Sequence, residues 1–339
     1  MKIKLLALAI SAVLATSTAA WADNTVTVDT TGNNNTLSAL QQGGNGNNIS
    51  ISQAAFNNQS TAAQNGNGNS ASIAQGTGGR FYNTTDNFGY TGTIANIAQT
   101  GGANSASINQ ENNNYWGNGS GSIQANINQQ GDSNTATISQ GYFYGYSASA
   151  AISQNGFANE ASINQTFGNH VAAIFQEGNY INHASIDQDV FGGTNNASIS
   201  QSNSNQATIR QTGEFNTDTA TINQSGQNAA QITQSGVSNT ASANINQNGF
   251  NNSADVDQSG NNVVATVFQG GVNSQVQVAQ SGSGDTVTVT QNGDFGSSAI
   301  IGQSGDNNTV TLNQNANVAN DNIMVTQSGL GNTASITQQ

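Results

Sequence analysis

The chain has 339 residues, contains neither cysteine nor proline, and carries 17 acidic but only four basic side chains, which gives a net charge of −13. A chain with so few cations cannot neutralise phosphate groups, so its composition argues against nucleic acids and anionic lipid surfaces as partners. Disulfides, on which exported proteins with a small core often depend, are excluded as well.

The first 22 residues have the layout of a secretory signal peptide. Lys2 and Lys4 precede a ten-residue apolar run at 5–14, and residues 20–22 form an Ala-x-Ala cleavage site. Such a run is too short to cross a bilayer, which takes about 20 apolar residues. We therefore predict cleavage before Asp23 and export, which takes the net charge to −15. No later stretch is apolar enough to span a membrane, so we expect no membrane span in the mature chain.

From Asp23 onward one cassette recurs, Asn-x-Ala-x-Ile-x-Gln, with clean copies at 69–75, 104–110 and 134–140. The closing glutamines define 24 units, and 12 of the 23 intervals between them are 11 residues long. Two positions before the glutamine lies Ile, Val or Leu in 23 of the 24 units. A repeat this regular indicates a solenoid or a related array.

Each cassette alternates with period two, which predicts a strand with Asn, Ala, Ile and Gln on one face and Ser, Thr, Asn or Asp on the other. A turn signal follows the glutamine, as at Ser225-Gly226 and Ser304-Gly305. No proline removes a backbone donor from the ladder. Frequent β-branched residues and glycines oppose a helix.

We predict an all-β fold, a cross-β solenoid with two strands per rung of about 22 residues and rungs about 4.8 Å apart. Ile and Ala fill a thin interior, and Asn and Gln form amide ladders that satisfy one another's donors and acceptors. The 24 units make 12 rungs, and a degenerate pair at 24–30 and 35–41 adds a thirteenth. Its register is ambiguous, because Leu40-x-Gln42 competes with Gln41.

The residues that we expect to form the ladder core are those at the Asn, Ile and Gln positions of the clearest cassettes. They are Gln53, Ile73, Gln75, Ile108, Gln110, Ile138, Gln140, Asn159, Ile163, Gln165, Asn195, Ile199, Gln201, Asn252, Val256, Gln258, Asn332, Ile336 and Gln338.

The chain thus divides into a signal peptide (1–22), a segment with the degenerate first repeat (23–52) and a repeat solenoid (53–339) with loop insertions at 76–93, 111–122 and 141–147. All three insertions follow a unit on the same side of the predicted coil. They are rich in aromatic residues, which on one interpretation form lateral contacts between fibres or with a surface. On the other, turns simply tolerate extra length and the rings pack on one another. The candidate contact residues are Tyr82, Tyr90, Tyr115, Trp116, Tyr142 and Tyr144.

The spacing Gln-x-Gly-x-x-Asn-x-Ala-x-x-x-Gln, seen at 247–258, resembles the repeat of the curlin family. The similarity extends over about residues 24–338. Curlins are subunits of curli, the amyloid fibres of bacterial biofilms. The resemblance implies a secreted subunit that polymerises into an adhesive fibre, or pilus, on a Gram-negative cell, with a surface nucleator and an outer-membrane secretion channel as partners. The family's serine six residues before the glutamine is mostly Asn here, or Asp at Asp218, Asp285 and Asp321.

Nothing in the sequence predicts an enzyme, a cofactor or a metal site. His170 and His183 lie at or beside the Asn position of their cassettes, and Asp255 and Asp257 share one outer face without a histidine, cysteine or lysine partner. Two alternative functions also fit a solenoid. One is a non-fibrous surface adhesin, and the other is an ice-binding protein, for which Thr286-x-Thr288-x-Thr290 supplies only part of the required threonine array.

Overall fold

The computed structural model describes residues 23–32, 34–54, 57–76, 92–111, 122–141, 147–293, 296–315 and 321–338. The predicted signal peptide lies outside these ranges. The chain forms two compact units, Met1–His170 and Val171–Gln339, whose boundary falls inside strand β11. No helix of the described ranges is long and apolar enough to cross a membrane.

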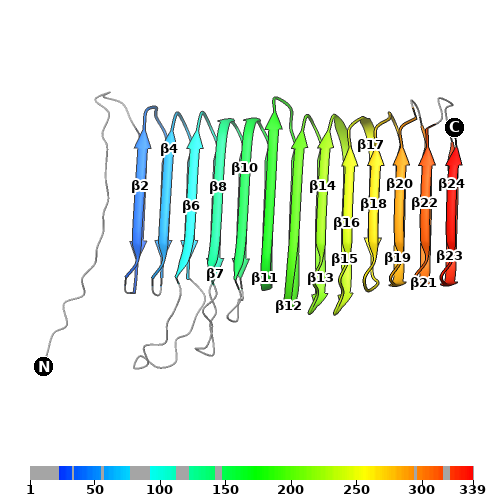
Figure 1. The fold of residues 1–339 in the computed structure, drawn as a ribbon. Helices are drawn as coiled ribbons and strands as arrows, with labels where there is room; N and C mark the ends of the chain where they lie inside the picture. Colours follow the sequence, from blue (N-terminus) through cyan, green and yellow to red (C-terminus); the bar gives the residue numbers. More distant parts are fainter. Residues whose placement is uncertain are drawn as a thin grey trace, which may run out of the picture. The chain divides into compact units, whose positions relative to one another are not determined.

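The first unit is built from parallel strands that each pair with the strand two positions along the chain, as β3 does with β1 and β5. Within the unit the strands run side by side (Figure 1). The strands are β1 (Thr25–Thr30), β2 (Thr36–Gln42), β3 (Asn48–Gln53), β4 (Gln59–Asn65), β5 (Ser70–Gln75), β6 (Thr93–Thr100), β7 (Ser105–Glu111), β8 (Ile123–Asp132), β9 (Thr135–Gly141), β10 (Ala148–Phe157) and β11 (Glu160–Gly178), which continues into the second unit.

The second unit repeats this arrangement, with β13 paired to β15 and β14 to β16. Its strands are β12 (His183–Ser202), β13 (Gln206–Glu214), β14 (Thr219–Ser225), β15 (Gln227–Val237), β16 (Ser242–Gln247), β17 (Phe250–Gln258), β18 (Val264–Gln269), β19 (Gln275–Ser283), β20 (Thr286–Gln291), β21 (Ser298–Asp306), β22 (Thr309–Gln314), β23 (Asn322–Leu330) and β24 (Thr333–Gln338).

Alternate strands build opposite faces of each unit, and we name the faces by their strands. Face A consists of β1, β3, β5, β7, β9, residues 160–165 of β11, residues 183–188 of β12, and then β13, β15, β17, β19, β21 and β23. Face B consists of β2, β4, β6, β8, β10, residues 171–176 of β11, residues 196–201 of β12, and then β14, β16, β18, β20, β22 and β24.

The predicted all-β solenoid with two strands per rung is confirmed. The degenerate pair does form an additional first rung, because β1 pairs with β3 and β2 with β4. The competing registers are resolved as well. Gln41, not Gln42, is opposite Gln64 and continues the series of closing glutamines.

The interior is made by the period-two alternation of the cassette. In β9, Ala136, Ile138 and Gln140 are buried, whereas Thr135 and Thr137 are exposed. Ala136 pairs with Ala161 of the next rung and Ile138 with Ile163, so like side chains stack on like. The core is therefore thin, apolar at its centre and polar where the amides lie.

The glycine two residues after the closing glutamine is required by the stacking of the turns. Gly101 has a φ of 113°, which L side chains rarely adopt, and a Cβ on it would lie 2.0 Å from the carbonyl oxygen of Gly131. Gly282 of the second unit faces the carbonyl oxygen of Gly305 in the same way, at 1.8 Å. A side chain at either position would push two rungs apart.

One expectation needs refinement, since the strands do not always end at the glutamine. β12 contains two cassettes and continues through the corner between them. Its corner residues still pair with the next rung, Asp189 with Thr212 and Phe191 with Glu214, because turns of similar shape stack as strands do.

The inside–outside pattern leads to a direct test with one charge at two adjacent positions. Ile163 is fully buried, and its neighbour Ser162 is exposed. Ile163→Asp buries an unpaired carboxylate and should lower the free energy of unfolding by several kcal/mol. Ser162→Asp should change it by less than about 0.5 kcal/mol. Denaturant unfolding of freshly prepared monomer measures both values, and equal losses would contradict the assigned faces.

Candidate functional site

The closing glutamines form two ladders in each unit, one under each face. Within each unit, the side-chain Nε2 of a closing glutamine donates to the Oε1 of the glutamine in the following rung. In the first unit the donor–acceptor distances are 3.0, 2.9, 2.9 and 2.8 Å along Gln53, Gln75, Gln110, Gln140 and Gln165. Under face B they are 3.2, 2.9, 2.8 and 2.8 Å along Gln41, Gln64, Gln99, Gln129 and Gln154.

In most of these glutamines the second amide hydrogen crosses the core. Nε2 of Gln64 donates to the backbone oxygen of Asn48 on the opposite strand at 3.0 Å, and Nε2 of Gln110 donates to that of Ile94 at 3.0 Å. A glutamine with both bonds joins successive rungs and also joins face A to face B. A buried amide that uses both hydrogens and its oxygen avoids the cost of an unmade hydrogen bond.

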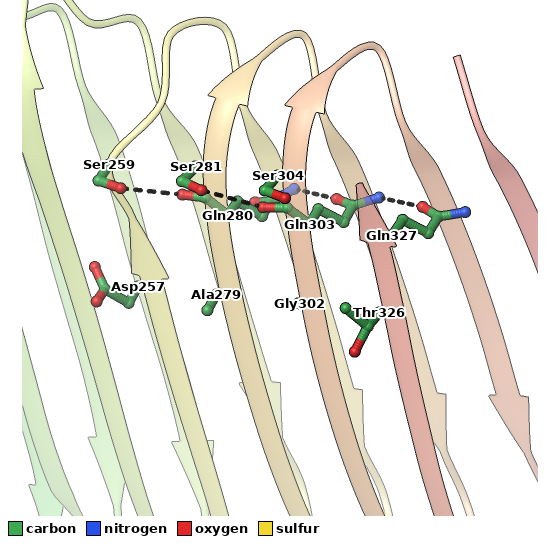
Figure 2. A pocket seen from close by; sticks show the side chains of 10 residues that line it. All are labelled: Asp257, Ser259, Ala279, Gln280, Ser281, Gly302, Gln303, Ser304, Thr326 and Gln327. Carbon is green, nitrogen blue, oxygen red and sulfur yellow. Dashed lines mark hydrogen bonds between the residues drawn. The ribbon is translucent and has the colours of Figure 1, made fainter. Parts of the chain in front are cut away.

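The ladders of the second unit have the same geometry. Under face A they pass through Gln188, Gln211, Gln234, Gln258, Gln280, Gln303 and Gln327 at 2.8–3.0 Å. Under face B they pass through Gln176, Gln201, Gln224, Gln247, Gln269, Gln291, Gln314 and Gln338 at 2.7–3.4 Å. Figure 2 shows the steps from Gln280 to Gln303 and from Gln303 to Gln327 as nearly collinear bonds. The donors all face the same way along the chain, so the ladder has a direction.

Thr30 occupies a ladder position where a glutamine is expected. It pairs with Gln53, whose Nε2 is fully used but whose buried Oε1 has no partner. This is the acceptor that a glutamine at position 30 would serve. Without a donor at position 30, a buried acceptor is left without a hydrogen bond, which lowers the stability of the first rung.

Asparagine forms a second column, which fastens each turn to its neighbours. Asn134 is buried, and its Nδ2 donates to the carbonyl of Gln130 in its own turn at 3.1 Å and to that of Gly156 in the next at 3.0 Å. Its Oδ1 accepts the backbone N–H of Asn159 at 3.0 Å. The second unit repeats the last contact between Asn205 and Asn228, also at 3.0 Å. The predicted amide ladders are thus confirmed for both residue types.

Asp218 interrupts this polar column with a buried carboxyl group. Its side chain has no exposed area, its Oδ1 accepts the N–H of Ala241 at 3.0 Å, and its Oδ2 has no partner. Burial raises the pKa of Asp218 from 3.8 to about 6, against the opposing effect of the Ala241 hydrogen bond. An amide one rung away, the Nδ2 of Asn195, is buried without a partner as well.

Few titratable groups lie close together on the outer surface of the described residues. Burial, and then the charge of Asp257, raise the pKa of Asp255 above its usual value. Asp257 also ends a groove of about 260 Å³ on face A, whose floor is formed by the small residues Ala279 and Gly302 and whose side is formed by a row of serines (Figure 2). In the described part of the chain, no three His, Cys, Asp or Glu side chains lie close enough together to hold a metal ion.

The structure places the predicted ladder residues as follows. Those that are buried are Gln53, Ile73, Gln75, Ile108, Gln110, Ile138, Gln140, Asn159, Ile163, Gln165, Asn195, Ile199, Gln201, Asn252, Val256 and Gln258. The three in β24 are less covered, with Asn332 exposed and Ile336 and Gln338 half-buried. β24 pairs with β22 and has no second neighbouring strand among the described residues.

The six aromatic residues proposed for lateral contacts, Tyr82, Tyr90, Tyr115, Trp116, Tyr142 and Tyr144, lie outside the described residues. The described strands that flank their loops are β5 and β6, β7 and β8, and β9 and β10. Each loop therefore leads from a face A strand to a face B strand.

The chain matches no family model, and no curated protein matches it either.

Restoring the missing ladder donor tests the energetic role of the glutamines. In Thr30→Gln, the new Nε2 reaches the orphaned Oε1 of Gln53 and should raise the free energy of unfolding by about 1 kcal/mol. Thr27→Gln, on the exposed side of the same strand, is the control and should have no measurable effect. Chemical denaturation measures both, and an equal response would show that the ladder bond adds no stability.

The buried carboxyl predicts a pH dependence. Because the pKa of Asp218 is higher in the folded chain, its contribution to stability is complete below about pH 4 and is lost as the pH rises through about 6. Asp218→Asn should therefore stabilise the chain at pH 7 by about 1–3 kcal/mol and much less at pH 4. Thermal unfolding across this range measures the difference. Asp306→Asn, at the exposed end of β21, is the control; a pH-independent gain in Asp218→Asn would refute the assignment.

Proposed function

We propose that the chain is a secreted structural subunit that self-assembles into extracellular amyloid fibres. The observation that carries the proposal is the glutamine ladder, which keeps the same donor-to-acceptor direction at every described step in both units. A rung with the same Asn, Ala, Ile and Gln spacing offers matching donors, acceptors and apolar contacts whichever copy supplies it. Growth by stacking rungs then needs no new kind of contact.

The resemblance to curlins supports the same proposal and adds detail to it. It suggests a curli-like fibre that contributes to biofilm matrix and adhesion, a cell-surface nucleator, and export through an outer-membrane channel. The chain's composition suits this role, because amide ladders stabilise a stacked fibre with few apolar residues and no disulfides.

Assembly kinetics test the proposal. The chain from Asp23 onward should form dye-binding fibres after a lag, because the first rung of a new fibre must order without a neighbour. Fragments of existing fibres should remove the lag. Diffraction from aligned fibres should show a meridional reflection at about 4.8 Å. A chain that stays monomeric with and without seeds would refute the proposal.

A matched pair of variants tests whether the ladder itself carries assembly. Gln234 is a buried ladder residue, and Gln231 lies on the exposed side of the same strand, β15. Gln234→Lys buries an unpaired charge and should abolish seeded growth, whereas Gln231→Lys should elongate like the wild type. Equal elongation of the two variants would mean that fibres grow by some other contact.

A further inference from the structure

Charge is distributed unequally between the two faces. In the second unit, the outward positions of face A hold Asp187, Arg210, Asp255 and Asp257. The outward positions of face B, as bounded above, hold no charged residue in the described part of that unit, and Glu177 lies just beyond them, where β11 continues past Gln176. They are Val171, Ala173, Phe175, Asn196, Ser198, Ser200, Thr219, Thr221, Asn223, Ser242, Asn244, Asn246, Val264, Thr266, Phe268, Thr286, Thr288, Thr290, Thr309, Thr311, Asn313, Thr333, Ser335 and Thr337.

The first unit has the same bias. Asp29 and Glu160 lie on its face A, at outward positions of β1 and β11. The outward positions of its described face B strands carry Ser, Thr, Asn, Gln and apolar residues, apart from Asp132 at the exposed end of β8. In both units, then, most of the acidic charge of the strands lies on face A, and the exceptions, Asp132 and Glu177, lie where a face B strand ends.

Face B of the second unit is also regular. Thr286 pairs with Thr309 and Thr309 with Thr333, and a parallel row contains Thr288 and Thr311. The rows repeat at the rung spacing of about 4.8 Å. They present short, stiff side chains with a methyl and a hydroxyl group, and face A has no such array because small residues at 279 and 302 open the groove of Figure 2 beside Asp257.

We propose that face B of the second unit is the lateral interface at which two fibres of this chain pair, face B against face B. Like charges repel wherever two copies of so acidic a chain approach, and this face brings no carboxylate opposite another. Rows of threonine, serine and asparagine at one constant spacing can interdigitate with an identical set, as in the dry interface of a steric zipper. The inference rests on the proposed fibre function.

Two added charges on this face should separate the fibres without stopping their growth. In Thr288→Asp/Thr311→Asp, adjacent rungs of face B carry carboxylates that meet their counterparts in the paired fibre. Electron microscopy should show single filaments in place of bundles, at the wild-type elongation rate. The control is Thr208→Asp/Gln231→Asp, which adds the same charge to adjacent rungs of face A and should leave the bundles intact.

Opposite charges should restore pairing. Filaments of Thr288→Asp/Thr311→Asp and of Thr288→Lys/Thr311→Lys, grown separately and then mixed, should bundle again at low salt and come apart as salt is added. A variant that is merely misfolded would not be rescued in this way.

The possible outcomes separate the two proposals. If wild-type fibres form but stay single, or if the face B aspartates leave their bundles intact, the lateral interface is wrong and the fibre function stands. If the face A control loses its bundles to the same extent, the lateral interface is also wrong, because bundling then depends on another surface or on net charge alone. If the wild type forms no fibres, the proposed function fails and this inference fails with it.

Discussion

A buried primary amide needs hydrogen-bond partners for two hydrogens and one oxygen, and the stacking of the rungs depends on how the glutamines find them. Gln110 donates one hydrogen to Gln140 along the ladder and the other to the Ile94 carbonyl across the core. Its oxygen accepts from Gln75. Only a parallel stack in exact register gives every glutamine this same set of partners. A chain with 34% hydrophobic residues can therefore order itself, because register errors leave buried amides unsatisfied.

The period of the cassette was sufficient to predict the fold, the inward residues and the ladders. The turn function of asparagine was not predictable from spacing. In an 11-residue interval, the position five after one glutamine is also the position six before the next. The 13-residue interval from Gln211 to Gln224 separates the two positions. Asn216, five residues after Gln211, donates its Nδ2 hydrogen to the Thr212 carbonyl at 3.0 Å. Asp218, six residues before Gln224, is the buried carboxyl. In this interval asparagine follows the turn, whereas in the interval of the same length from Gln188 to Gln201 the asparagine is Asn195, six before the closing glutamine.

The charge bias between the faces was present in the sequence but hidden by its order. Outward residues of successive cassettes alternate between face A and face B. Acids of face A such as Asp187 and Asp257 are therefore separated along the chain by face B strands, whose outward residues are uncharged. Sorting the cassettes into odd and even units would have revealed it. The missing ladder donor at Thr30 follows from the pairing of β1 with β3, which places Thr30 opposite Gln53. The choice between Gln41 and Gln42 needed the structure, because it depends on how β2 pairs with β4.

The asparagine position also shows how the solenoid accommodates its insertions. Asn58 is followed along face B by Thr93, Ile123 and Ala148, which occupy the same inward position in the next three rungs. Each of these three rungs follows one of the long insertions. Asn58 donates to the Ala54 carbonyl in its own turn at 2.7 Å, and the position that corresponds to Asn58 has no asparagine after any of the long insertions. The position is then filled by side chains that pack, and Ile123 contacts Ala148. The glutamine ladder is undisturbed: Gln64 and Gln99, 35 residues apart, are still joined at 2.9 Å. Loop length can vary freely at this edge because the turn and the ladder are stabilised by different amides.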